Sequence, residues 1–346
     1  MALIVAGLPI VAGIAGAQEG PAPEGPLAGA PPNLVAVLAA HSRDFDTVVA
    51  QSLAEGGEPR EVARIAHLPD HAVRGAVSPD GRLLALNVPN GGSPSRPRGS
   101  LQILDLATGA ETALGEGLDA LGTPLWRPDG LAVIARRNAA FEGAAAVELV
   151  EFPVTGAPGG LRARFTDVLG AYPVAFDPEG RLLVVLIDAR GSTLVREDGV
   201  EWELSAGVTR DWELSPTGST LAFIEDSTVE GGRRFQARLK ALDGSVTAAA
   251  EVSLSGQQLG VAWRAGSPAP TFGFEPGAAG ASAQASSRRD GFDVPLAFSP
   301  DGAVLAVEAW TGQSFADHDE VRLAFVTASG RRVIAGPVRF LGWSAR

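Results

Sequence analysis

The segment AFSPDGAVLAVEAW, residues 297–310, is decisive because the chain contains near-copies of it. They are AVSPDGRLLALNV (76–88), AFDPEGRLLVVLID (175–188) and ELSPTGSTLAFIED (213–226). Each copy predicts a strand, a tight turn and a second strand, because proline pre-sets φ and glycine accepts the positive φ that closes the turn. The residues after the glycine are apolar at both odd and even positions of the strand. Such strands are buried on both faces, which favours sheets stacked face to face.

The repeats recur with the period of a propeller blade. The turn prolines are Pro79, Pro128, Pro178, Pro216 and Pro300, and Ala265 takes their place in a degenerate copy at 261–275. Neighbouring positions are 35 to 50 residues apart. A period of roughly 40–50 residues with four short strands per unit is typical of a β-propeller. A β-sandwich, the alternative, predicts no such long-period similarity.

The two ends of the chain complement each other. Residues 338–346, VRFLGWSAR, copy only the first half of the repeat, whereas 33–40, 46–53 and 60–68 read as three strands without an inner partner. Pairing the last strand with these three closes the ring and protects its edges. The sequence thus predicts an all-β, seven-bladed β-propeller. Six blades is the alternative, because 275–291 makes a poor outer pair of strands.

Composition excludes several classes of function. The 346 residues carry a formal charge of −12 with a pI of about 4.9, whereas a nucleic-acid-binding protein needs a basic surface. The chain has no cysteine, which excludes disulfides, thiolate metal sites and a cysteine nucleophile. No cofactor motif occurs, so no cofactor is predicted.

The amino terminus predicts export. Residues 2–17 are apolar and end in Ala15-Gly16-Ala17, which is typical of a secretory signal peptide over 1–17. The run is shorter than the roughly 20 residues of a membrane span. A retained anchor is the alternative, because no basic residue precedes the run. A Pro/Gly/Ala linker with nothing to bury follows over 18–32, and the propeller is expected over 33–346, in the periplasm or secreted, with no membrane span in the mature chain.

The Ser-Pro-Asp-Gly turns, each followed by an apolar strand, resemble the TolB-type, WD-repeat-like β-propeller family of secreted bacterial proteins. The resemblance covers about residues 33–346 and implies a stand-alone exported propeller. Some members of this family carry an α/β-hydrolase domain with a Gly-x-Ser-x-Gly elbow. This chain has no such elbow.

The loops between second and third strands are the candidate binding loops, because propellers place function in loops at one mouth of the ring. These loops differ from repeat to repeat and carry charges of both signs. Such a rim suits a peptide, a protein loop or a sugar polymer. The predicted binding residues are Arg96, Arg98, Arg136, Arg137, Asp188, Arg190, Asp226, Arg233, Arg234, Trp310, Asp317 and His318. The Pro-Asp-Gly turns lie on the opposite face and are expected to be structural.

Several histidines, acidic residues and tryptophans could belong to a metal or substrate site, but structural roles explain them better. His41, His67 and His71, with Asp44, Asp46 and Asp70, could hold a metal ion. The His67–His71 pair lies on no predicted helix, however, so its spacing does not align the rings, and no metal is predicted. ADHDE (316–320) lacks the order of a calcium loop and reads as a solvated loop. Trp126, Trp263 and Trp343 share a repeat position with Phe176 and Phe298, which predicts packing between blades.

Two functions remain open from sequence. The first is an exported, non-catalytic propeller that binds a protein, peptide or envelope polymer through its mouth loops. The alternative is a propeller enzyme of the lactonase or lyase type, with a metal or a carboxylate/histidine site at the mouth. Its candidate residues are His71, Asp188, Asp226 and His318.

Overall fold

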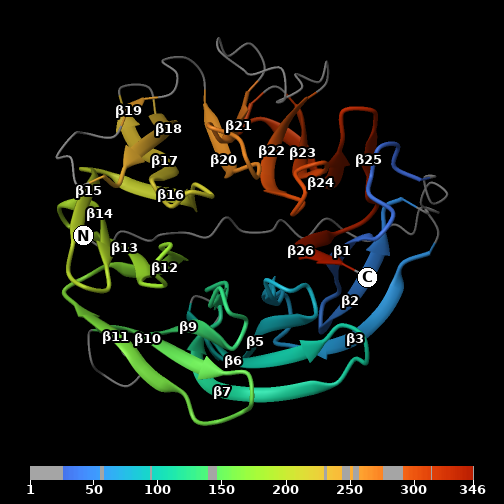
Figure 1. The fold of residues 1–346 in the computed structure, drawn as a ribbon, viewed down its shortest axis with the longest axis horizontal. Helices are drawn as coiled ribbons and strands as arrows, with labels where there is room; N and C mark the ends of the chain where they lie inside the picture. The colour runs from blue at the N-terminus through green and yellow to red at the C-terminus, as the bar shows by residue number, and fades with distance from the viewer. Residues whose placement is uncertain are drawn as a thin grey trace.

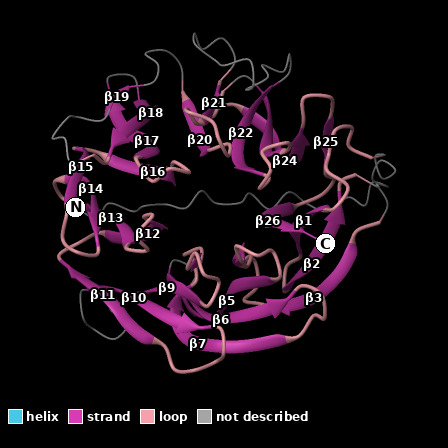
Figure 2. Ribbon diagram, viewed as in Figure 1, coloured by secondary structure: helices cyan, strands magenta, loops and turns pink. Residues whose placement is uncertain are grey.

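A computed structural model describes residues 26–54, 58–93, 96–138, 146–229, 232–243, 250–251, 257–275, 291–312 and 314–345. Figure 2 shows that these residues form strands, turns and loops, without a helix. No helix long and apolar enough to span a membrane is therefore found in this part of the chain. The predicted signal peptide, 1–17, and the linker as far as residue 25 lie outside the described residues.

The turn at residues 78–81 shows why the Ser-Pro-Asp-Gly motif recurs. The Ser78 amide donates to the Leu83 carbonyl at 2.8 Å, and the Gly81 amide donates to the Ser78 carbonyl at 2.9 Å. The Ser78 hydroxyl donates to Asp80 Oδ1 at 2.6 Å and accepts from the Leu83 amide at 2.9 Å. Gly81 has a φ of 74°, in the left-handed region. Ser78, Asp80 and Gly81 therefore each have a defined role in reversing the chain.

The described residues form seven antiparallel sheets, in each of which one strand is innermost in the ring (Figure 1). The first sheet contains β26 (Val338–Ala345), β1 (Leu34–His41), β2 (Phe45–Ser52) and β3 (Arg60–Ala66). The second contains β4 (Arg74–Val77), β5 (Leu83–Ser93), β6 (Arg96–Asp105) and β7 (Glu111–Asp119). The third contains β8 (Leu125–Trp126), β9 (Ala132–Asn138), β10 (Ala146–Pro153) and β11 (Gly160–Thr166).

The remaining sheets continue around the ring. The fourth contains β12 (Gly170–Phe176), β13 (Leu182–Asp188), β14 (Gly191–Arg196) and β15 (Glu201–Ser205). The fifth contains β16 (Val208–Leu214), β17 (Thr220–Val229), β18 (Gly232–Ala241) and β19 (Ala250–Glu251). The sixth contains β20 (Gln258–Ala262) and β21 (Thr271–Phe274). The seventh contains β22 (Gly291–Phe298), β23 (Leu305–Gly312), β24 (His318–Val326) and β25 (Arg331–Val333).

This arrangement is a β-propeller, as Figure 1 shows, with the sheets in sequence order around a ring. Six sheets have four strands and form six blades, which is the alternative count expected from the sequence, whereas seven was the preferred count. The sixth sheet has two described strands and occupies the place of the degenerate repeat. Residues 276–290, which follow it, are outside the described part of the chain.

The ring closes as the sequence predicts. Strand β26 pairs antiparallel with β1, from Leu34 opposite Ala345 to Ala40 opposite Val338. In Figure 1 the red end of the chain thus lies beside its blue beginning. The first sheet is completed by strands from both ends of the described chain.

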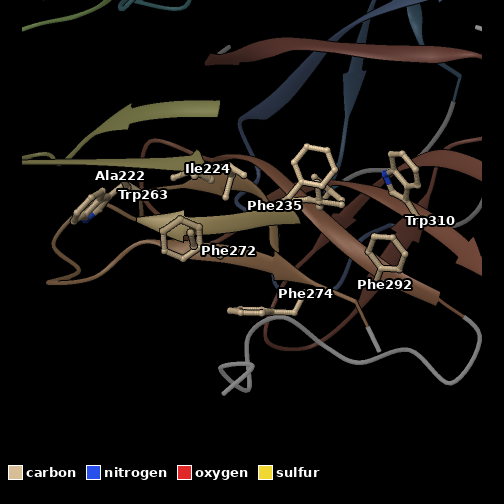
Figure 3. Close-up of a cluster of buried hydrophobic side chains, with 12 residues drawn as sticks. Ala222, Ile224, Phe235, Trp263, Phe272, Phe274, Phe292 and Trp310 are labelled. Atoms are coloured by element: carbon tan, nitrogen blue, oxygen red, sulfur yellow. The ribbon is translucent and has the colours of Figure 1, made fainter. Parts of the chain in front are cut away.

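The hydrophobic core lies between neighbouring sheets. Trp126, for example, packs with Ala85 and Ile103 of the second sheet and donates from Nε1 to the Ala76 carbonyl at 2.7 Å. This confirms the expectation that Trp126 packs between blades. Figure 3 shows a larger cluster, in which Phe235, Phe272 and Trp310 belong to three successive sheets.

The end of the predicted linker packs against the propeller, unlike a segment with nothing to bury. Leu27 is 4% exposed and belongs to a core cluster that includes Leu53 and Phe325. The Leu27 amide donates to the Leu53 carbonyl at 2.8 Å. One leucine in a Pro/Gly/Ala-rich segment is enough to anchor it, because burying a leucine side chain contributes about 1.5–3 kcal/mol.

Candidate functional site

The candidate site lies on the face of the ring where the innermost strands begin and the second and third strands connect. We call this face the mouth face. Each innermost strand starts here and runs toward a turn on the opposite face, as β4 runs from Arg74 toward the turn at 78–81. Charged residues at the start of innermost strands therefore gather at this face.

Two arginines, Arg74 and Arg339, occupy such positions on the neighbouring innermost strands β4 and β26. Burial, together with the positive charge of Arg339, lowers the pKa of Arg74 to about 10. Burial also lowers the pKa of Arg339, and the charges of Asp46 and Glu308 oppose this shift only in part. Within the described part of the chain, neither guanidinium has a hydrogen bond or ion pair to another side chain. Among the described residues, the mouth face thus holds two adjacent cations that form no direct ion pair with a carboxylate.

Glu308 and Asp211 bring negative charge to the same region. Burial raises the pKa of Glu308, and the charge of Asp211 raises it further. Glu308 Oε2 accepts a hydrogen bond from Trp310 Nε1 at 3.2 Å. Asp211, with a φ of 53°, accepts from Arg210 Nε at 3.1 Å and from the Gly260 amide at 3.2 Å. These two carboxyl groups are held by other partners, and among the described residues neither of them forms a hydrogen bond or ion pair with Arg74 or Arg339.

His41, Asp46 and His67 form a second cluster on the mouth face. His41 Nδ1 lies 2.6 Å from Asp46 Oδ1, and His67 Nε2 lies 3.1 Å from the same oxygen. The two imidazole rings are stacked with centroids 5.5 Å apart. The structure therefore brings together three residues of the metal set considered from sequence.

The other members of that set stay apart from the cluster. The His71 Nδ1 atom lies 2.8 Å from the Pro69 carbonyl oxygen, within its own turn. Neither Asp44 nor Asp70 belongs to a group of potential metal ligands among the described residues.

The predicted rim arginines of the third sheet are paired with carboxylates. Arg136 contacts Asp119 of the neighbouring sheet at 2.6 Å, and its guanidinium lies 4.5 Å from the centroid of the Tyr172 ring. Arg137 donates from Nε and Nη2 to Glu148 Oε2 at 2.8 and 2.5 Å. Arg136 therefore joins three sheets, and Arg137 joins two strands of one sheet.

The predicted binding residues of the fourth and fifth sheets pair with each other within single hairpins. Arg190 Nη2 donates to Asp188 Oδ2 at 2.7 Å, and this hydrogen bond lowers the pKa of Asp188. Arg233 pairs in the same way with Asp226 across the β17–β18 hairpin. Arg96, Arg98 and Arg234 lie in the corresponding hairpins, where Arg96 and Arg98 are exposed and Arg234 is half-buried.

The predicted aromatic residue of the rim, Trp310, is buried. It is 7% exposed and packs against Phe292 and Phe315 with ring centroids 5.7 and 5.3 Å away. The exposed His318 ring covers its edge, with a centroid distance of 4.4 Å. Trp310 is thus part of the core beneath the mouth, and His318 and Asp317 present the exposed surface there.

Sequence reasoning missed Arg74 and Arg339. A signal was present, because Arg74, Arg210 and Arg339 all stand five or six residues before the repeat position of the turn proline. A charged residue at the start of an innermost strand breaks an otherwise apolar pattern.

A cavity of about 240 Å³ lies at the opposite face, between the first and second sheets. Its lining includes Gly81 and Arg82 of the turn, Arg60, Asp105 and Ser344. The Arg60 guanidinium donates to the Leu106 carbonyl at 2.8 Å, which ties β3 to the neighbouring sheet. This cavity is separate from the mouth face.

Comparison with solved structures supports the fold. Over 90% of this chain, the structure is similar to TolB from Acinetobacter baumannii, with a TM-score of 0.53 and 14% identity. The chain spans about two thirds (66%) of that TolB chain. It is also similar to the β-propeller domain of the trilobed protease from Pyrococcus furiosus, with a TM-score of 0.54, 10% identity and coverage of 88% and 94% of the two chains. The protein has the β-propeller fold.

Enzymes are among the similar structures as well. The prolyl endopeptidases match with a TM-score of 0.53 and 12% identity, over 89% of this chain and 50% of theirs. No protein-family model matches the sequence. No curated protein matches it either. These similarities establish the architecture and leave binding and catalysis to be argued from the residues of the mouth face.

Proposed function

We propose that this protein is a non-catalytic binding propeller that holds an acidic peptide segment of a partner protein at its mouth face. The observation that carries the proposal is the Arg74–Arg339 pair, which lies on innermost strands without a carboxylate partner in the described part of the chain. Planar guanidinium groups bind carboxylates through two parallel hydrogen bonds. A bound carboxylate would also relieve the repulsion between the two cations.

The lowered pKa of Arg74 supports this assignment. Burial and the neighbouring cation together disfavour the charged form. The chain keeps these two groups close together at a cost to stability, which is typical of a site shaped for a ligand. Predicted rim residues of the third, fourth and fifth sheets form charge pairs, and a peptide offers backbone groups of both polarities to such a rim.

The localisation and the type of propeller are part of the same proposal. We infer that the protein is exported through the segment 1–17 and acts in the periplasm or outside the cell as a TolB-type propeller. The TolB similarity bears on the fold alone, and the inference of export rests on the apolar segment 2–17 that ends in Ala15-Gly16-Ala17. The enzymatic alternative is less favoured, because His71, Asp188, Asp226 and His318 lie in four different loops. His71 and His318 each contact a carbonyl oxygen of their own loop, and the two aspartates are paired with arginines.

The test is fluorescence anisotropy with a labelled hexaglutamate peptide and the full chain. We expect saturable binding that falls at least about tenfold in Arg74→Gln and in Arg339→Gln, since a charge-assisted hydrogen bond contributes roughly 1.5–3 kcal/mol. Arg64→Gln is the matched control, because Arg64 is 64% exposed, pairs with Glu61 of its own strand β3 and is not among the predicted binding residues. A hexaserine peptide should not bind.

Three results would count against the proposal. Absence of peptide binding excludes an acidic peptide ligand. Binding that is insensitive to Arg74→Gln and Arg339→Gln but lost in Arg190→Gln moves the site to the rim. If alginate binds more tightly than the peptide, the ligand is an anionic polysaccharide and not an acidic peptide.

A further inference from the structure

We propose that His41, Asp46 and His67 form a divalent-metal site, with Zn²⁺ as the ion that best suits its ligands. The ligand atoms that these three residues offer all lie within 4.8 Å of one another. Two imidazoles and one carboxylate are a common zinc donor set, whereas Mg²⁺ and Ca²⁺ take mostly oxygen ligands. This site goes beyond the proposed function, because peptide binding by Arg74 and Arg339 does not require it.

The surroundings of His67 point to a positive species beside its ring. His67 Nδ1 lies 2.8 Å from the Leu68 carbonyl oxygen, so Nδ1 carries a hydrogen and donates it. His67 Nε2 faces Asp46 Oδ1 at 3.1 Å. A bare lone pair on Nε2 would repel the carboxylate, so either a second proton or a metal ion must lie between these two atoms. Metal-binding histidines usually donate their other ring N–H to a carbonyl or carboxylate in just this way.

The Asp46 carboxylate is held in a fixed orientation. Its Oδ2 atom accepts a hydrogen bond from the Val73 amide at 2.8 Å, which aims Oδ1 at the two imidazoles. The Asp46 side chain is 1% exposed and the His67 side chain is 0% exposed. Two of the three ligands are therefore buried and pre-oriented, which reduces the entropy lost when an ion binds.

Adjacent strands of one sheet position all three ligands. His41 ends β1 and pairs in register with Asp46 near the start of β2. His67 directly follows β3, and its amide donates to the Asp44 carbonyl at 3.1 Å. Ligands on paired strands keep their spacing more precisely than ligands on free loops.

The distances fit a site that holds either a proton or a metal ion between the imidazoles and the Asp46 carboxylate. Zinc–nitrogen and zinc–oxygen bonds of about 2.0–2.2 Å place tetrahedral ligand atoms about 3.3 Å apart. The His67–Asp46 separation of 3.1 Å is close to this value, whereas the His41–Asp46 separation of 2.6 Å is a hydrogen-bonding distance. Zinc would replace the proton between His41 and Asp46 and move the His41 ring slightly outward. Among the three ligands, His41 is the one that solvent reaches, with a side chain 24% exposed.

Arg339 provides a test that separates the two proposals. Its charge interacts with that of Asp46, and a dication at the site would be disfavoured by the nearby guanidinium. Arg339→Gln should therefore tighten zinc binding, although the same substitution should weaken peptide binding. Failure of one proposal does not imply failure of the other.

The experiment is calorimetric titration of ZnCl₂ into the full chain after treatment with EDTA, together with thermal melts with and without zinc. We expect one zinc ion per chain and a melting temperature that rises by several degrees, because a ligand that binds only the folded state stabilises it. His41→Gln should lower zinc affinity at least about tenfold. His71→Gln is the matched control and should keep full affinity, because His71 lies outside the cluster.

The remaining outcomes overturn the proposal. Absence of zinc binding, or equal affinity in His41→Gln and the native chain, means that Asp46 only accepts hydrogen bonds from two imidazoles. Equal loss of affinity in His71→Gln places the ion elsewhere. If His41→Gln fails to fold in EDTA, the absorption spectrum of the native chain with Co²⁺ decides whether the chain has a tetrahedral metal site. Tetrahedral bands support the site, and the spectrum of octahedral aqueous Co²⁺ excludes it.

Discussion

Glu213 shows what burial on an innermost strand does to a single carboxyl group. It lies near the end of β16, and burial raises its pKa to about 8, although a hydrogen bond from the Trp263 amide acts in the opposite direction. In the unfolded chain this carboxyl group would release its proton near the ordinary glutamate pKa of 4.5. The free energy of unfolding therefore falls as pH rises from about 4.5 to 8, and the full cost applies above pH 8.

We expect Glu213→Gln to remove this pH dependence. Relative to the native chain, the variant should gain about 2 kcal/mol of stability between pH 4 and pH 9. The expected gain is less than half of the free energy obtained by converting the whole pKa shift at 1.36 kcal/mol per pKa unit. The reason is that the Glu213 side chain keeps some contact with solvent. Urea unfolding at several pH values measures the difference, with Glu203→Gln on the exposed side of β15 as the control for loss of one charge. A difference that stays constant with pH would show that Glu213 ionises normally.

At the scale of the element, the closing strand depends on a glycine. Gly342 in β26 has a φ of 142°, and a Cβ atom there would lie 2.9 Å from the Cβ and Cγ2 atoms of Val77. A bulge in the β1–β26 pairing, between Val37 and Leu38, lies opposite this residue. The close approach of β26 to β4 thus requires the absence of a side chain at this position.

Gly342→Ala should destabilise the protein by about 1–3 kcal/mol through backbone strain and contact with Val77. Gly117→Ala is the matched control, because Gly117 also has a positive φ of 71° but no atom within 4 Å of the added Cβ. The difference between the two variants in chemical denaturation isolates the contact between the first and second sheets. Equal destabilisation by the two substitutions would mean that the positive φ alone, and not contact with Val77, accounts for the stability lost in Gly342→Ala.

At the scale of the whole molecule, closure of the ring by β26 protects the inner edge of β1. Seven residues of β1, Leu34 to Ala40, pair with β26. Without β26 these backbone groups would form an unpaired edge, and Leu341, which is 5% exposed, would be lost from the core between the first two sheets. Exposed edges of this kind invite pairing with another chain.

A chain that ends at Pro337 should therefore unfold at a lower temperature than the full chain and associate in solution. Scanning calorimetry and light scattering after gel filtration measure both effects. A chain that lacks only Arg346, which lies outside the described residues, is the control. A truncated chain that stays monomeric with an unchanged melting temperature would show that closure contributes little.

The repeat and its turns determined the propeller from sequence alone, because they depend on local chemistry. Proline, glycine and the Ser78 hydroxyl act within a few residues of one another, and their recurrence along the chain predicts the blades. The complementary half-repeats at 33–68 and 338–346 likewise predicted the closing pair of β1 and β26. The sequence left six and seven blades open where the repeat degenerates, at the sheet with two described strands.

The site was decided by the tertiary structure, because its contacts join residues far apart in the chain. Nothing local indicates that Arg136 pairs with Asp119, or that Trp310 is buried beneath His318. Arg74 and Arg339 become neighbours only when the ring closes, and His41, Asp46 and His67 converge only when three strands pair in register. Sequence patterns report what adjacent residues do to the backbone, whereas distances between charges depend on how the sheets pack.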